Sequence, residues 1–172
     1  ADGAQPAAPW TLHAAGKVAP AQSQGQPVPV DLAAVRARCY TALDLTTFDQ
    51  QLRDQGITYG PAFQALTHLW VGEGEALGYV TLPQTLVATA GAYQLHPVLL
   101  DAALRVASSL LPDADANPYL PFGVEQVRLF RQSGQTVGQT LAQTRLWSHV
   151  RRSAEATSTP GNIPGNTPGN YE

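Results

Sequence analysis

The chain has 172 residues, of which 44% are hydrophobic and 13% are charged, so its composition is that of one folded domain and not of a disordered chain. A net charge of −3 and a sequence pI near 5.7 exclude the basic surface that nucleic acids and acidic membranes attract. No apolar run approaches the ~18 residues of a membrane helix, so we expect neither a nucleic-acid nor a membrane partner.

Metal and disulfide chemistry is also disfavoured. The chain has a single cysteine, Cys39, which can form no internal disulfide and no cysteine-based metal site. The histidines lack the paired spacing of a zinc motif; they are His13, His68, His96 and His149. We therefore expect a metal-free protein of the cytoplasm. The absence of methionine and an ending directly after a turn-rich stretch indicate part of a longer polypeptide.

The first thirty residues predict the end of one structural unit and a linker. Residues 1–18 begin as a loop rich in Ala, Pro and Gly, and the alternation that starts at Trp10 fits a short strand. Residues 19–30 hold three prolines and one glycine, a composition typical of linkers.

Two short helices are predicted after this linker. Asp31 can cap the first, over residues 32–40. The second is predicted over residues 47–55. Thr46 with Asp49 forms a weak capping box at its start, and Gly56 is the glycine expected at its C-terminal end.

Four strands are predicted in the rest of the chain. Residues 66–71 and 76–82 alternate as strands and are joined by a hairpin turn at residues 72–75. Two further strands are predicted over residues 119–130 and 139–150. Beyond them, the end of the chain repeats Pro-Gly-Asn every four residues, which indicates a disordered or loosely turning insertion and only weakly a binding repeat.

A long helix is predicted over residues 97–111. Pro97 suits its first position and Pro112 its end. The residues between them are apolar nearly all round, which is typical of a buried helix. One buried helix among antiparallel strands predicts an α+β layer arrangement.

Asp101 is the unusual residue of this helix. A buried carboxylate is costly, and loss of hydration raises its pKa, so that it can act as a general acid. Two structural interpretations compete with this one: Asp101 could favour the helix start, or pair with Arg105 one turn along. On spacing alone, the structural interpretations are the more common.

Two neighbouring features also have ordinary explanations. His96, directly before the helix, is more often a cap or loop residue than a catalyst. The sequence Tyr59-Gly60-Pro61 is first of all a turn signal. No Gly-x-Ser-x-Gly, Walker or dinucleotide-binding motif is present in the sequence.

Three segments together resemble polyketide synthase dehydratase domains. Residues 56–64 resemble the family's Gly-Tyr-x-Tyr-Gly-Pro-x-Phe motif, and residues 96–104 resemble its catalytic aspartate helix. Residues 119–124 resemble its Leu-Pro-Phe-x-Trp segment, with Val124 in place of the tryptophan. The order and spacing of the three also match, and the resemblance covers residues 10–150.

The resemblance implies a double hotdog fold, in which each half is a curved antiparallel sheet around a long central helix. Such domains remove water from a 3-hydroxyacyl group on the phosphopantetheine of an acyl carrier protein, without a further cofactor. A histidine of the first half takes the α-proton, and an aspartate of the second half serves the leaving hydroxyl. On this mapping, residues 1–18 end the first half, 19–30 are the linker, 31–150 are the C-terminal hotdog, and 151–172 are an insertion or tail.

The same mapping makes Asp101 the catalytic acid. The residues expected to support the substrate site are Tyr59, Gly60, Pro61, Arg105 and Phe122. The family's base lies in a His-x-x-x-Gly-x-x-x-x-Pro motif that no histidine here fits, so the chain alone is expected to be inactive. Its expected partners are the acyl carrier protein, the N-terminal half, neighbouring synthase domains and, in a homodimer, a second copy. The edge left open by the other half predicts self-association.

Arg105 stands where the family usually has Gln or His. If it faces Asp101, its charge would hold the acid ionised and lower its pKa; alternatively it points to solvent or to the carrier protein. Two further functions therefore stay open: an inactive structural or docking fragment, and a double-bond isomerase or cyclase on the same scaffold.

Overall fold

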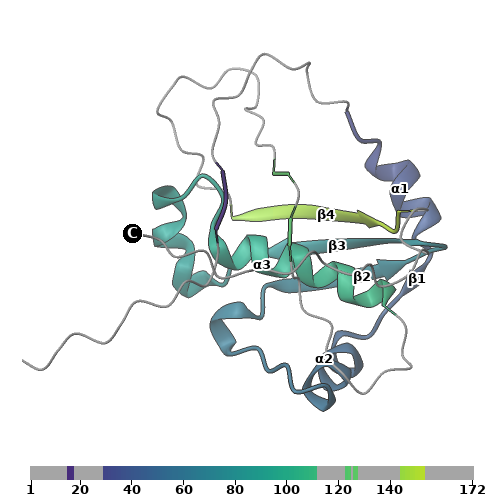
Figure 1. The fold of residues 1–172 in the computed structure, drawn as a ribbon, viewed down its shortest axis with the longest axis horizontal. Helices are drawn as coiled ribbons and strands as arrows, with labels where there is room; N and C mark the ends of the chain where they lie inside the picture. Colours follow the sequence, from purple (N-terminus) through teal and green to yellow (C-terminus); the bar gives the residue numbers. More distant parts are fainter. Residues whose placement is uncertain (1–14, 18–28, 112–122, 125, 128–143, 154–172) are drawn as a thin grey trace, which may run out of the picture.

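A computed structural model of the chain describes residues 15–17, 29–111, 123–124, 126–127 and 144–153. In these ranges four antiparallel strands form one sheet in the order β1-β2-β3-β4 (Figure 1). The strands are β1 Thr41–Ala42, β2 Leu66–Val71, β3 Glu75–Thr81 and β4 Arg145–Arg151. The α-helices are α1 Leu32–Arg38, α2 Leu45–Asp54 and α3 Pro97–Arg105, and the 3-10 helices are η1 Pro61–Phe63, η2 Gln84–Ala92 and η3 Val106–Leu110.

Aspartate caps begin the first two helices. Asp31 accepts a hydrogen bond from the Ala34 backbone N–H at 3.0 Å, which confirms the predicted cap of α1. The α2 cap is Asp44, whose Oδ2 accepts from the Thr47 N–H at 2.9 Å, so the predicted capping box of Thr46 and Asp49 is wrong. The capping box fails because Asp44 already satisfies the helix start.

The other ends of these two helices follow ordinary stop signals. Gly56 follows α2 with φ +85°, the left-handed conformation that a C-terminal glycine allows, so its predicted role is confirmed. α1 ends at Arg38, two residues before its predicted end, because the chain turns there into β1.

The β2–β3 hairpin forms where it was predicted. The Gly72 N–H donates to the Glu75 carbonyl at 2.8 Å, and Gly74 takes the positive φ of +67° that the turn requires. β4 then pairs with the whole length of β3, from Glu75 opposite Arg151 to Thr81 opposite Arg145.

The main core lies between the sheet and α3 (Figure 1). Leu99 and Ala102 of α3 and Val106 of η3 are fully buried there against side chains such as Val80 of β3. Phe48 and Leu52 of α2 close the side of this core, whereas α1 packs a smaller cluster against the opposite face: Val35, Cys39 and Leu77. The sheet is thus covered by helix on both faces.

The predicted long helix differs from the observed one. It is α-helical only to Arg105 and continues as the 3-10 helix η3, in which the Ser109 hydroxyl donates to the Val106 carbonyl at 2.8 Å and competes with helical hydrogen bonding. Leu100 and Leu104 are 42% and 43% exposed within the described part of the chain. The prediction of burial all round was therefore wrong, because an apolar pattern cannot tell which partner covers each face.

Several predictions fall on residues outside the described ranges. They include most of the 10–18 strand, most of the linker, nearly all of the 119–130 strand and nearly all of the tail; residues 15–17 are exposed and belong to no strand. The last strand, predicted over residues 139–150, is observed as Arg145–Arg151 in the described part of that segment. Among the described residues, no helix is long and apolar enough to span a bilayer, and no cluster of three or more His, Cys, Asp or Glu could hold a metal ion.

Candidate functional site

Asp101 is the acidic residue of α3. It is the fifth residue of the helix and follows the first turn, so it lies too far along α3 to serve as a helix-start residue. Its side chain is half-buried, and its Oδ2 is buried with no hydrogen-bond partner among the described residues. Burial raises the pKa of this carboxyl above its usual value of 3.8. Burial therefore favours the protonated form of this carboxyl.

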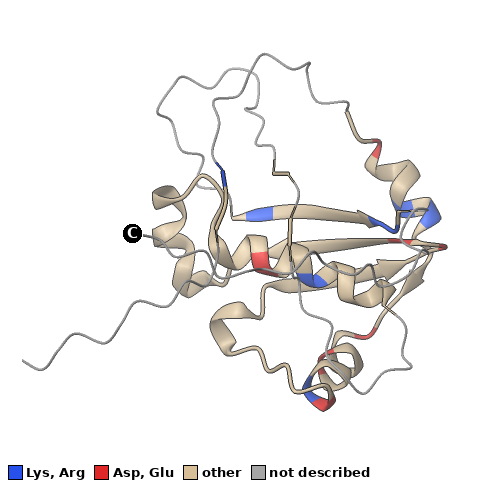
Figure 2. Cartoon of the chain, viewed as in Figure 1, with Lys and Arg blue, Asp and Glu red and all other residues tan. Residues whose placement is uncertain are grey.

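Arg105, the other charged residue of α3 (Figure 2), does not pair with Asp101. Its guanidinium is buried, with only 4% of the residue exposed, and forms an ion pair with Asp49 of α2. Burial lowers the pKa of Arg105 to about 10, which leaves it charged at neutral pH. Both predicted placements of Arg105, against Asp101 and toward solvent, are therefore wrong, because Asp49 compensates the buried cation instead.

Tyr59 lies against Arg105. Its ring is stacked under the Arg105 guanidinium, with 4.4 Å between the guanidinium carbon and the ring centroid. Burial, and then the negative charge of Asp101, raise the pKa of the Tyr59 hydroxyl above 10. No hydrogen bond joins Tyr59 and Asp101 in the described structure, so the predicted support of Asp101 by Tyr59 stays a prediction.

The turn after Tyr59 is built by Gly60 and Pro61. Gly60 precedes the 3-10 helix η1 in an extended conformation, and Pro61 occupies its first position, where proline fits best. The Gly60 carbonyl accepts a hydrogen bond from the Phe63 N–H at 2.9 Å. This turn packs against α3, and it carries Tyr59 to the helix. Phe122, the remaining predicted site residue, lies outside the described residues.

His96 is a helix cap, as the ordinary interpretation predicted. Its Nδ1 accepts a hydrogen bond from the Val98 N–H at 3.2 Å. Its Nε2 lies 3.2 Å from the Thr89 hydroxyl, which itself donates to the Leu86 carbonyl at 2.7 Å. This chain of bonds makes Nε2 the donor to Thr89, so both ring nitrogens are engaged and neither is free to act as a base.

The sequence interpretation missed Asp49 and Phe48 as members of this site. The Arg105 guanidinium carbon lies 5.4 Å from the Phe48 ring centroid, and the Arg105 charge is paired by Asp49. The available signal was an acidic residue beside the apolar face of an amphipathic helix, between Phe48 and Leu52. The Thr46–Asp49 spacing suggested a capping box, and this interpretation concealed the role of Asp49 as the ion-pair partner of Arg105.

The outer face of the sheet carries two further groups of side chains. Glu75 is bound by Arg38, with 2.5 Å between Nε and Oε1, and by His149, with 2.8 Å between Nε2 and Oε2. These partners, Arg38 first, lower the pKa of Glu75 to about 2. The same face carries a cluster of aromatic rings, in which Trp70 stacks on His68 and on Trp147 and Tyr79 meets Trp147 at a tilt. This face is separated from Asp101 by the sheet.

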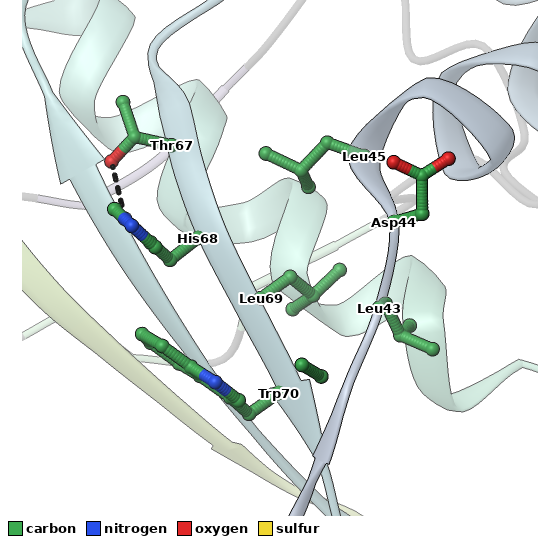
Figure 3. A pocket seen from close by; sticks show the side chains of 8 residues that line it. Leu43, Asp44, Leu45, Thr67, His68, Leu69 and Trp70 are labelled. Carbon is green, nitrogen blue, oxygen red and sulfur yellow. Dashed lines mark hydrogen bonds between the residues drawn. The ribbon is translucent and has the colours of Figure 1, made fainter.

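A cavity of about 270 Å³ lies at the edge of the sheet between β2 and the start of α2 (Figure 3). Its lining residues are Ala42, Leu43, Asp44, Leu45, Thr67, His68, Leu69 and Trp70. The Asp44 carboxylate is already used as the α2 cap, and His68 Nδ1 lies 3.3 Å from the Thr67 hydroxyl. This cavity does not include Asp101, so we do not assign the chemistry to it.

Comparison with known proteins identifies the family. Residues 27–165 match the sequence profile described as "Polyketide synthase dehydratase N-terminal domain". The chain belongs to the polyketide synthase dehydratase family. The relatives include polyketide synthase GfsB of Streptomyces halstedii, 39% identical over 75% of this chain, and spectinabilin synthase protein NorA of Streptomyces orinoci, 37% identical over 71%. These segments make up 2% and 6% of the two relatives.

Solved dehydratase domains confirm the α+β hotdog fold. The domains from the CurK and CurF modules of curacin polyketide synthase both match with a TM-score of 0.64, at 34% and 33% identity. The matches cover 74% and 76% of this chain, but only 43% and 44% of those domains. Two CurK mutants described as inactive, one aspartate to asparagine and one histidine to phenylalanine, match with the same TM-score of 0.64.

Proposed function

We propose that this chain is the aspartate-bearing half of a dehydratase domain, in which Asp101 is the general acid. The observation that carries the proposal is the half-buried Asp101 carboxyl of α3, whose Oδ2 has no hydrogen-bond partner among the described residues and whose pKa is raised by burial. A carboxyl group whose pKa is raised holds its proton to a higher pH, and it can give that proton to a leaving hydroxyl.

The proposed reaction removes water from a 3-hydroxyacyl thioester. A base takes the proton from the α-carbon, the α,β double bond forms, and the C–O bond at the β-carbon breaks. Asp101 supplies its proton to the departing hydroxyl, which leaves as water, and the product is an α,β-unsaturated thioester. Tyr59, on the adjacent turn with Gly60 and Pro61, shapes the wall of the site next to the acid.

The base is proposed to be a histidine of the other hotdog half. This chain spans less than half of the dehydratase domains it matches, and in the CurK domain both an aspartate and a histidine substitution are described as inactivating. The exposed Leu100 and Leu104 lie one turn apart on α3, and they form an apolar stripe that suits a helix of that half.

The substrate is proposed to arrive on the phosphopantetheine of an acyl carrier protein within a larger cytoplasmic synthase. The elimination needs only an acid and a base, so the proposal involves no metal or further cofactor.

The test is dehydration by the complete parent domain, compared with its Asp101→Asn version. We expect mass spectrometry of a 3-hydroxyacyl thioester to show loss of one water with the parent and a rate at least ~100-fold lower with Asp101→Asn. Glu73→Gln, in the exposed hairpin turn, is the matched control and should keep the parent rate. Equal rates for the parent and Asp101→Asn would refute the role of Asp101.

A further inference from the structure

The Asp49–Arg105 ion pair connects α2 to the helix of the proposed acid. The Arg105 side chain is 2% exposed and the Asp49 side chain is 27% exposed. A cation this deeply buried needs a compensating anion, since its desolvation is otherwise very costly. Asp49 supplies that anion from a different helix, so the direction of the guanidinium depends on α2.

Aromatic rings fix the remaining sides of the guanidinium. Its carbon lies 4.4 Å from the centroid of the Tyr59 ring and 5.4 Å from that of the Phe48 ring. Its Nε has no hydrogen-bond partner among the described residues. Asp49 Oδ1 has no hydrogen-bond partner among them either, so the ion pair with Asp49 is the polar contact that the described residues give the guanidinium.

Asp101 is one helical turn before Arg105, a spacing at which the two side chains can meet. They do not pair: Asp101 Oδ2 has no partner within the described ranges, and the pKa of Asp101 is raised by burial alone. A guanidinium released from Asp49 would have Asp101 as an available anion.

The other charged and titratable groups around α3 leave Arg105 as the relevant cation. Tyr59 comes from the turn before η1, and Asp49 comes from α2. His96 is engaged as the α3 cap. The charged residues of β3 and β4 share the outer face of the sheet: Glu75, Arg145, His149 and Arg151. Arg152 donates instead to the Leu110 carbonyl at the end of η3.

We infer that Asp49 is a positioning residue, which holds the Arg105 guanidinium against Tyr59 and away from Asp101, so that Asp101 keeps its proton for the acid step. The inference rests on the proposed function. It adds a positioning role for Asp49, which is needed because Arg105 stands where the family usually has Gln or His. A cation four residues after the acid is compatible with proton donation only while its charge is directed elsewhere.

The decisive variant is Asp49→Asn in the complete domain. Without the anion, Arg105 turns toward Asp101 and stabilises its ionised form, so the alkaline limb of the pH–rate profile moves to lower pH. Each unit of that shift lowers the rate above the limb tenfold, and we expect a loss on the order of tenfold. The second variant, Asp49→Asn with Arg105→Gln, removes the cation as well and should return the limb toward its original position.

A direct titration separates this inference from the proposed function. The carboxyl ¹³C signal of Asp101, assigned by its loss in Asp101→Asn, should titrate at lower pH in Asp49→Asn than in the parent domain, whether or not the domain is active. Near-UV circular dichroism checks that each variant is folded. An unchanged Asp101 titration in folded Asp49→Asn, or a shift that persists in the double variant, would overturn the inference. An inactive parent with the expected titration shift would refute only the dehydratase proposal.

Discussion

At the scale of single residues, the site depends on how each charge is paired. Asp101 has a buried oxygen with no hydrogen-bond partner in the described part of the chain, whereas the guanidinium one turn later forms an ion pair with Asp49. The two carboxyl groups therefore differ: Asp49 balances a buried cation, and Asp101 has no ion-pair partner among the described residues. A residue that is left unpaired in this way weakens the fold, which is a cost typical of functional groups.

Because the buried Asp101 carboxyl weakens the fold, we expect Asp101→Asn to stabilise the protein in a pH-dependent way. The pKa of Asp101 is raised in the folded state, so the folded state binds the proton more tightly than the unfolded state does. The carboxyl contributes stability below its ordinary pKa of 3.8, and this is lost as the pH rises through the folded value. We expect Asp101→Asn to gain up to about 1 kcal/mol in free energy of unfolding near pH 8.

Urea unfolding of the complete domain, at about pH 5 and about pH 8, checks this prediction. The gain of Asp101→Asn over the parent should be larger at the higher pH. A gain that is the same at both values would mean that ionisation of Asp101 does not weaken the fold.

At the scale of elements, the position of α3 is set by a close approach to the sheet. A Cβ added at Gly78 of β3 would collide with Val106 Cγ2, and Val106 is fully buried. The absence of a side chain at Gly78 therefore lets η3 and the end of α3 lie directly on β3. The Ser148 hydroxyl of β4 adds a hydrogen bond of 2.9 Å to the Ala103 carbonyl of the same helix.

We expect Gly78→Ala to destabilise the domain by about 1–3 kcal/mol, because the added methyl group overpacks a filled core. Gly91→Ala is the matched control: Gly91 lies on the exposed side of η2, where a Cβ would meet nothing within 4 Å. The control should change stability by less than about 0.5 kcal/mol. Thermal unfolding of both variants measures the difference, and equal stabilities would show that α3 can shift without loss.

The elements were more predictable than the contacts between them. The hairpin at Gly72–Gly74, the cap at Asp31 and the glycine stop at Gly56 follow local rules, and all three were found. The ion pair of Asp49 and Arg105 was not predictable, since it joins residues 56 positions apart (105 − 49) through tertiary packing. The exposure of Leu100 and Leu104 was mispredicted for the same reason: periodicity gives an apolar face but not its partner.

At the scale of the whole molecule, the described fold leaves an apolar stripe uncovered. Leu100 and Leu104 are each more than two-fifths exposed on α3, on the side that does not face the sheet. A stripe of large apolar side chains on a central helix is typical of a surface that another element covers. In the proposed domain, this element belongs to the other hotdog half.

We expect the chain alone to self-associate through this stripe, and Leu100→Gln with Leu104→Gln to reduce the association. Sedimentation velocity over a range of concentrations measures it. Leu32→Gln, which changes a leucine of α1 that is 38% exposed, is the control and should leave the association unchanged. Association that is equal in all three proteins would place the contact elsewhere.

The pairing of β3 with β4 has a consequence for synthesis on the ribosome. The paired residues lie about 70 positions apart in the chain, whereas the other edge of β3 pairs at once with β2 through a short turn. At roughly 5–20 residues per second, translation leaves the β4-facing edge of β3 without its partner for several seconds. During that interval the nascent chain presents a ready-made β edge to its neighbours, so the speed of elongation between the two strands bears on how much of the protein reaches its native state.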